Sequence, residues 1–313
     1  MRMLTLTAAL LGVALAISQP PAALADDDPA WQACVGKTTA PAERVTACST
    51  VIDGRTETGR RLATAYCGRG HGLTETRKLD AALADLNEAI KLDPGYACAY
   101  SNRGRVYAFK HDLDHAMADY DEAIRVDPTF ALAYNNRGDA WLSKGDLDRA
   151  LADFDLAIKY NPQLAVAYDN RAFAYFRKRD TAHAIADYTT EIQLQPNALA
   201  YINRGNVYSV MKQLDRAAAD YGEATRIAPT DPRGWRNRGL LRLYTDDIKG
   251  GIADYDKALQ YDPNDANSWS NRGLGKMQLG DKKGAAADFR KALELRPDLK
   301  TAQEALDRLG ATR

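Results

Sequence analysis

The apolar and polar residues along most of the chain alternate with the period of an α-helix. In residues 131–164, apolar residues recur three and four positions apart in two runs, ALAYNNRGDAWLSK and LDRALADFDLAIKY. This spacing places the apolar side chains on one face of each helix. Gly145 and Asp146 separate the runs, and an Asp at this point suits the cap of the second helix. Pro162 stops the second helix, so the stretch predicts a pair of helices joined by a short turn.

The same pattern recurs along the sequence with a spacing of 34 residues, and once of 33. Asn-Arg-Gly, or Asn-Arg-Ala in one copy, begins at residues 102, 136, 170, 203, 237 and 271. Prolines follow in phase at 94, 128, 162, 196, 229, 263 and 297. These positions define seven units, which are 63–96, 97–130, 131–164, 165–197, 198–231, 232–265 and 266–299. Self-similarity of this kind predicts a repeat array, in which stacked units bury one continuous core.

Small and aromatic residues occupy fixed places in the units. Glycine, or alanine in one unit, stands midway along the first helix, and alanine or glycine stands on the second helix, so that the two helices can approach closely. Large residues then fill the spaces between units. One such row contains Tyr66, Tyr100, Tyr134, Tyr168, Tyr201, Trp235 and Trp269. We therefore expect nearly all aromatic residues to pack in the core.

At these positions the sequence resembles the tetratricopeptide repeat family, which has this repeat length and this order of aromatic, small and proline positions. The resemblance implies an all-α protein, a right-handed superhelical solenoid of antiparallel helix pairs. Residues 300–313 are expected to form a C-terminal capping helix, with Ala302, Leu306 and Leu309 facing one way. One departure from the family pattern is Glu191, which stands where other units have a small residue.

Every unit also has an arginine in its first helix and an aspartate in its second. The arginines are Arg69, Arg103, Arg137, Arg171, Arg204, Arg238 and Arg272, and the aspartates are Asp85, Asp119, Asp153, Asp187, Asp220, Asp254 and Asp288. The family more often has an apolar residue at the arginine position. A partly buried arginine requires a partner, so we predict seven Arg–Asp pairs within or between adjacent units. The alternative is a basic ladder that binds a ligand.

The first 25 residues have the composition of a secretory signal peptide. Arg2 is followed by an apolar run from Leu4 to Ile17 and by the small-residue sequence Ala23-Leu24-Ala25. The run is too short for a comfortable membrane span, so we expect cleavage after Ala25 and export, most simply to a bacterial periplasm. An uncleaved N-terminal anchor is the alternative.

Residues 26–62 differ from the units and are expected to form an N-terminal cap, in which residues 43–52 resemble a degenerate second helix. An oxidising compartment would favour disulfide bonds between the four cysteines, which allow three pairings. Sequential pairing, Cys34 with Cys48 and Cys67 with Cys98, is preferred.

The net charge and the absence of certain motifs argue against nucleic-acid binding, metal binding and catalysis. The 42 Lys and Arg residues balance 42 Asp and Glu residues, whereas a nucleic-acid-binding protein normally has a basic excess. The sequence has four His and no C-x2-C spacing, so no metal or cofactor is expected. Nucleophile-elbow, phosphate-loop and zinc-protease motifs are absent, and we predict that the protein is not an enzyme.

The family resemblance implies that the first helices line a concave face, and three groups of residues there are candidates for partner binding. The first is a ladder of asparagines, whose amides suit a peptide backbone and which holds peptides in related superhelices. Its members are Asn102, Asn136, Asn170, Asn203, Asn237 and Asn271. The alternative is that these asparagines stabilise the repeat itself.

The second group is apolar and the third is basic. The apolar residues are Leu132, Leu142, Val166, Phe173, Phe176, Leu199 and Ile202. If they are exposed, they indicate an interaction surface; the alternative is that some of them pack against neighbouring helices. The arginines Arg233, Arg236 and Arg242 could meet an acidic ligand or form a solvated face.

From these residues we predict a non-catalytic periplasmic scaffold that binds a protein or peptide segment in its concave groove. One alternative is a carrier of a hydrophobic small molecule or lipid, which would need a closed apolar cavity. Another is a structural protein that self-associates through its terminal units.

Overall fold

A computed structural model describes residues 26–36 and 38–310, and within them the regular structure is helical. The predicted signal peptide, residues 1–25, lies outside the described residues. The protein divides into two compact units, Met1–Val126 and Asp127–Arg313. No helix in the described part of the sequence is both long and apolar enough to cross a membrane.

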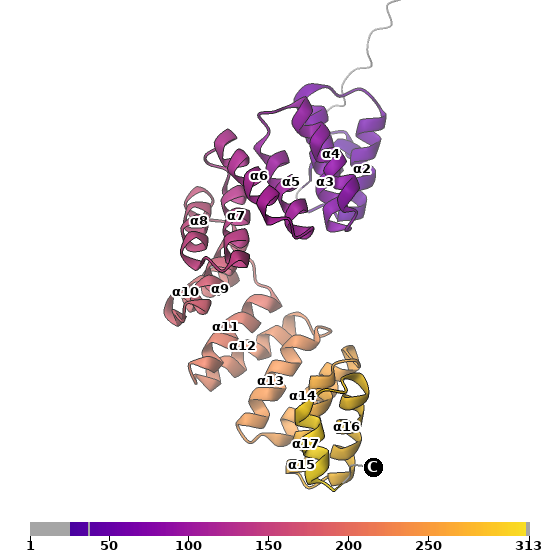
Figure 1. Ribbon diagram of the computed structural model, residues 1–313, viewed down its shortest axis with the longest axis vertical. Helices are drawn as coiled ribbons and strands as arrows, with labels where there is room; N and C mark the ends of the chain where they lie inside the picture. Colours follow the sequence, from indigo (N-terminus) through magenta and orange to yellow (C-terminus); the bar gives the residue numbers. More distant parts are fainter. Residues whose placement is uncertain (1–25, 37, 311–313) are drawn as a thin grey trace, which may run out of the picture. The chain divides into compact units, whose positions relative to one another are not determined.

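Among its described residues the first unit contains six helices, of which Figure 1 labels all but the first. They are α1 (Pro29–Val35), α2 (Pro41–Asp53), α3 (Gly59–Glu75), α4 (Leu79–Leu92), α5 (Ala97–Phe109) and α6 (Leu113–Val126). The predicted cap is formed by α1 and α2, which pack on α3. The Cys34–Cys48 disulfide joins α1 to α2, as predicted. Trp31 and Val51 share a buried cluster with Ala65 of α3, so the cap covers one side of the first repeat.

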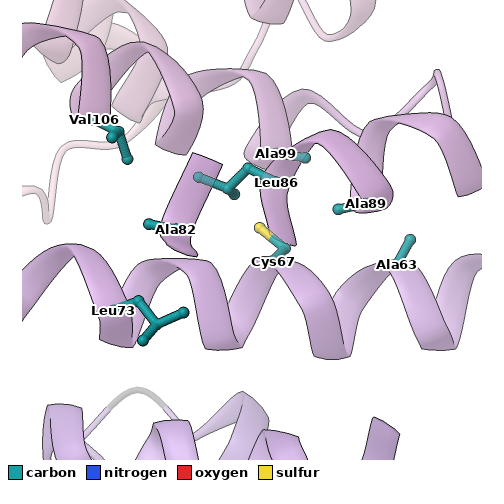
Figure 2. Close-up of a cluster of buried hydrophobic side chains, with 8 residues drawn as sticks. All are labelled: Ala63, Cys67, Leu73, Ala82, Leu86, Ala89, Ala99 and Val106. Carbon is teal, nitrogen blue, oxygen red and sulfur yellow. The ribbon is translucent and has the colours of Figure 1, made fainter. Parts of the chain in front are cut away.

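The core of the first unit is built as the small-residue pattern predicts. Figure 2 shows eight buried residues of α3, α4 and α5 gathered in one cluster. Leu86 of α4 is fully buried, and an added Cβ at Gly70 of α3 would stand 2.8 Å from its Cγ. The two helices can therefore pack at this distance only because α3 has no side chain at that point.

Over residues 127–310 the second unit contains eleven helices. They are α7 (Ala131–Lys144), α8 (Leu147–Tyr160), α9 (Ala165–Arg177), α10 (Thr181–Leu194), α11 (Ala198–Val210), α12 (Leu214–Ile227), α13 (Pro232–Tyr244), α14 (Ile248–Tyr261), α15 (Ala266–Gln278), α16 (Lys282–Leu295) and α17 (Lys300–Arg308). Each first helix packs on the second helix of its own repeat, and that second helix packs on the first helix of the next repeat. Asp146 accepts a hydrogen bond from the backbone N–H of Arg149, which confirms the predicted cap of α8.

The last helix closes the array. Ala302, Ala305 and Leu306 of α17 share a buried cluster with Phe289 of α16. This arrangement confirms the predicted C-terminal capping helix, which covers apolar surface that the last repeat would otherwise expose.

The seven predicted Arg–Asp pairs are all present, and each lies within one repeat. In every pair the arginine Nε and Nη2 donate to the two carboxylate oxygens of the aspartate, over 2.7 to 2.9 Å. Several arginines also use Nη1 to contact the preceding repeat, as Arg171 does with Asp155. The pairs therefore join helices within repeats and between them, which supports the structural interpretation over a free basic ladder.

The second predicted disulfide is wrong for this structure. Cys67 and Cys98 are free thiols whose sulfur atoms lie 3.6 Å apart, with Cys67 donating a hydrogen bond to Cys98. That hydrogen bond and burial raise the pKa of the Cys67 thiol, whereas the same hydrogen bond lowers the pKa of Cys98. Asn102 Nδ2 also donates to the Cys67 sulfur over 3.2 Å, so the pair is held as hydrogen-bonded thiols between α3 and α5.

Candidate partner-binding site

Asparagines of the predicted ladder donate hydrogen bonds from one first helix to the preceding one. In the second unit these bonds join Asn170 to Asn135, Asn203 to Asp169 and Asn237 to Asn206, each 3.1 Å long. The Nδ2 groups of these three asparagines thus stabilise the repeat stack. Their carbonyl oxygens accept no hydrogen bond from the described residues, so a partner could still bond to them.

The other ladder members have different surroundings. Asn102 donates to the sulfur atoms of Cys67 and Cys98. Asn136 accepts a hydrogen bond of 3.3 Å from Asn135, and Asn271 lines a small hollow of about 250 Å³ together with Arg236. The ladder is therefore continuous in sequence but not uniform in its contacts.

The predicted apolar surface is partly exposed and partly core. Leu132, Val166, Phe173 and Leu199 have between 39% and 44% of their surface exposed. Phe176 is half-buried and lines a pocket. Two residues do not face a partner: Ile202 is 4% exposed and packs with Ala198 and Ala224, and Leu142 is 9% exposed beside Phe154. These two point toward neighbouring helices, where burial stabilises the stack.

The predicted cluster of arginines is neutralised within the fold. Arg233 pairs with Asp231 over 2.6 Å and Arg236 with Asp265 over 3.0 Å. Arg242 contacts Asp254 over 2.9 Å, where it adds to the repeat's own Arg–Asp pair. The arrangement corresponds to local ion pairing rather than to an open anion site.

Three exposed apolar residues were missed in the sequence. Val210, Leu240 and Tyr244 are 63%, 54% and 64% exposed, and all three line a hollow of about 460 Å³ between α11 and α13. A signal was present, because Val210 and Tyr244 occupy the same place in consecutive units, one repeat apart. Following each position of the first helix through the units would have made Val210 and Tyr244 candidates, but their exposure is visible only in the structure.

Two carboxyl groups, those of Asp169 in α9 and Glu191 in α10, interact within the second unit. Glu191 of α10 is 6% exposed, and its Oε1 accepts a hydrogen bond of 3.0 Å from Asn197, whereas its Oε2 is buried and has no hydrogen-bond partner among the described residues. Burial raises the pKa of Glu191 to about 7, and the neighbouring Asp169 also acts to raise it. Burial also raises the pKa of Asp169, which accepts a hydrogen bond from Asn203. At neutral pH the pair therefore holds a proton part of the time.

Helix pairs in a regular stack, with polar amides and exposed apolar side chains along the first helices, define a helical repeat protein. Tetratricopeptide repeat profiles match residues 70–108, 101–165, 198–231 and 266–299, and the last two matches coincide with two of the 34-residue units. The protein therefore belongs to the tetratricopeptide repeat family. None of the curated proteins matches it in sequence.

Solved structures share the fold. A component of the APC/C hetero-tetramer Cut9–Hcn1 superposes with a TM-score of 0.66 and 16% identity over 90% of this protein, which spans 54% of that component's length. The pilF protein of Pseudomonas aeruginosa gives a TM-score of 0.61 at 18% identity, over 68% of this protein and 97% of its own length. YrrB, described as a TPR protein with an unusual peptide-binding site, gives 0.51 at 21% identity, over 60% of this protein and 97% of its own length.

Proposed function

We propose that the protein is a non-catalytic scaffold that binds a segment of another protein along its first helices. The observation that carries this proposal is the row of exposed apolar side chains on those helices, which includes Val166, Phe173 and Leu199. Val166 and Phe173 lie seven positions apart, two turns along one face of α9. Exposed apolar surface of this kind usually marks an interaction site.

The polar groups between these side chains fit the same proposal. The carbonyl oxygens of Asn170 and Asn203 lie beside the apolar row and accept no bond from the part of the sequence described here. They can accept a hydrogen bond from a peptide N–H. Hollows on this face open to solvent, which favours a groove over the closed cavity that a lipid carrier would need.

We further propose that the scaffold acts in the periplasm. The proposal rests on the sequence of residues 1–25, and the Cys34–Cys48 disulfide is compatible with an oxidising compartment. Detection of the full-length protein only in the cytoplasmic fraction would contradict it.

The test is a crosslinking capture from periplasmic extract with residues 26–313 as bait. A second bait carries Val166→Ser, Phe173→Ser and Leu199→Ser, which remove exposed apolar surface without touching the core. The control bait carries Tyr261→Ser, a 37% exposed residue at the end of a second helix. We expect the unmodified and control baits to capture the same protein and the triple variant to lose it. Equal capture by all three folded baits would refute binding at this face.

A further inference from the structure

Two open pockets adjoin on the first-helix face of the second unit. One is the hollow of about 460 Å³ between α11 and α13, lined by Val210, Leu240 and Tyr244. The other is about 500 Å³ and is lined by Phe176, Arg177 and Val210. Because Val210 borders both pockets, they form one continuous surface, which we call the Val210 surface.

The exposed apolar residues of the Val210 surface, unlike the half-buried Phe176, are not part of a repeat's core. Val210, Leu240 and Tyr244 are the most exposed large hydrophobic side chains among the described residues. At the place of Val210 and Tyr244, units 131–164 and 266–299 have the polar residues Ser143 and Gln278. Since other units fold with polar residues at this place, packing does not explain the apolar side chains.

The rim of the surface is positively charged and uncompensated. Arg177 and Arg179 line one pocket and Lys212 lines the other. Within the described residues none of these three forms an ion pair, although Lys178, in the same turn, binds Asp148. The cation of Lys212 instead lies 4.9 Å from the ring centre of Tyr244, and that of Arg177 lies 5.9 Å from the ring centre of Phe173.

Two acidic residues that follow these helices in sequence are engaged in helix caps. Asp180, next to Arg179, accepts hydrogen bonds from His183 at the start of α10. Asp247 accepts one from the backbone N–H of Gly250 at the start of α14. An acidic group on a partner would be attracted to the three cations of the rim, which form no ion pair within the described residues.

Two amides that line the hollow between α11 and α13, Asn206 and Asn237, offer the hydrogen bonds of a peptide unit. Asn206 Oδ1 accepts from Tyr221 over 2.8 Å and from Asn237 over 3.1 Å, which fixes both amides. Asn206 Nδ2 and Asn237 Oδ1 make no hydrogen bond to any residue that the structure describes. One donor and one acceptor side by side suit the carbonyl and N–H groups of a peptide backbone, whereas a hydrocarbon tail has no use for them.

We propose that the Val210 surface binds an acidic and apolar peptide segment of the partner protein. Apolar side chains of the segment enter the two pockets on either side of Val210. A carboxylate of the segment meets Arg177, Arg179 or Lys212, and its backbone bonds to Asn206 and Asn237. This inference rests on the proposed function and states the chemistry of the partner.

The test measures binding of fluorescent synthetic peptides by anisotropy. One set contains a glutamate and two apolar residues, leucine or phenylalanine, in every order and spacing. Two matched sets replace the glutamate with glutamine or the apolar residues with serine. We expect members of the first set to bind about tenfold more tightly than their matched peptides, and high salt to weaken them most.

Variants then place the binding on the protein. Val210→Ser with Leu240→Ser is expected to weaken the best peptide about tenfold at any salt concentration. Arg177→Gln with Lys212→Gln is expected to weaken it about tenfold at low salt and to abolish the advantage of glutamate over glutamine. The control variant is Leu279→Ser with Lys283→Gln, which changes one exposed apolar residue and one exposed basic residue outside both pockets. This control variant should bind the peptide as tightly as the unmodified protein. Circular dichroism confirms that each variant is folded.

Several results would overturn the inference. It fails if glutamate and glutamine peptides bind equally, if no peptide binds, or if the control pair weakens binding as much as the pocket variants. It also fails if a fluorescent fatty acid binds here more tightly than any peptide and is lost in Val210→Ser, because the surface would then hold a lipid. The capture experiment with periplasmic extract separates this inference from the proposed function. If the pocket variants still capture the partner protein and the Val166, Phe173 and Leu199 variant does not, this inference is rejected and the proposed function stands.

Discussion

At the scale of single residues, the paired arginines and aspartates carry most of the polar structure of the fold. The aspartates are buried, and the arginine side chains are between 14% and 22% exposed. Both carboxylate oxygens and two arginine nitrogens are used in every pair, so little of either charge is left without a partner. The pairs could be predicted because an arginine and an aspartate recur at fixed positions in all seven units, and each partly buried arginine needs a partner of opposite charge.

Removing one partner should cost far more than removing both. Asp220→Ala leaves Arg204 partly buried without its carboxylate and is expected to destabilise the protein by about 3 kcal/mol or more. The double variant Arg204→Leu with Asp220→Ala should lose clearly less, because no charge is left unpaired. Urea unfolding followed by circular dichroism measures both. Equal losses in the two variants would show that the pair is not coupled.

Glu191 should make stability depend on pH. Its pKa in the folded protein, about 7, lies above its ordinary value of 4.5, so the fold favours the protonated carboxyl group. This contribution is fully present below pH 4.5 and is lost as the pH rises through about 7. The titratable groups that face Glu191 are Asp169 from α9 and Tyr188 from α10, and the α11 N-cap side chain bonded to it is the neutral Asn197.

Glu191→Ala, which restores the small residue of other units, should therefore raise the melting temperature more at pH 8 than at pH 5. The expected gain at pH 8 corresponds to roughly 1 to 3 kcal/mol. Glu191→Gln keeps the hydrogen bond with Asn197, carries no charge, and should remove the same pH dependence. Parallel melting curves for wild type and both variants across this pH range would contradict the assignment.

At the scale of elements, each helix depends on its nearest neighbours. Within each compact unit, the first helix of a repeat contacts the second helix of the same repeat and that second helix contacts the next first helix, whereas α17 contacts only the last repeat. Helix boundaries could be predicted closely because each unit has its own turn and proline. The second disulfide could not, since cysteine spacing does not report the distance between two sulfur atoms on α3 and α5.

Removal of residues 300–313 should accordingly have a local effect. It uncovers the buried cluster around Phe289 and Ala286, so amide hydrogen exchange should accelerate in α15 and α16. Exchange in α7 and α8 should remain unchanged, because neither contacts α17. Leu306→Ser changes a single residue that is 4% exposed and is a smaller perturbation than the deletion. It should also accelerate exchange in α15 and α16 and leave α7 and α8 unchanged. Uniform acceleration along the second unit would indicate that this unit unfolds as one block.

At the scale of the whole molecule, the sequence pattern and the contacts divide the protein differently. The repeat period continues across Val126 without interruption, yet the contacts define two compact units that divide after that residue. The spacing of apolar residues along a helix specifies which face of that helix is buried inside a repeat. It does not specify how closely one repeat packs on the next, which depends on the shapes of both.

The sequence by itself determined the all-helical repeat architecture, its seven units, the capping helices and the Arg–Asp pairs, because all of these follow from short-range spacing repeated many times. Only the tertiary structure decided which residues of the first helices face solvent. Ile202 and Val210 lie on the same helix, but one is in the core and the other borders two open pockets. The difference arises because exposure on this face is set by side chains of neighbouring repeats, far away in sequence.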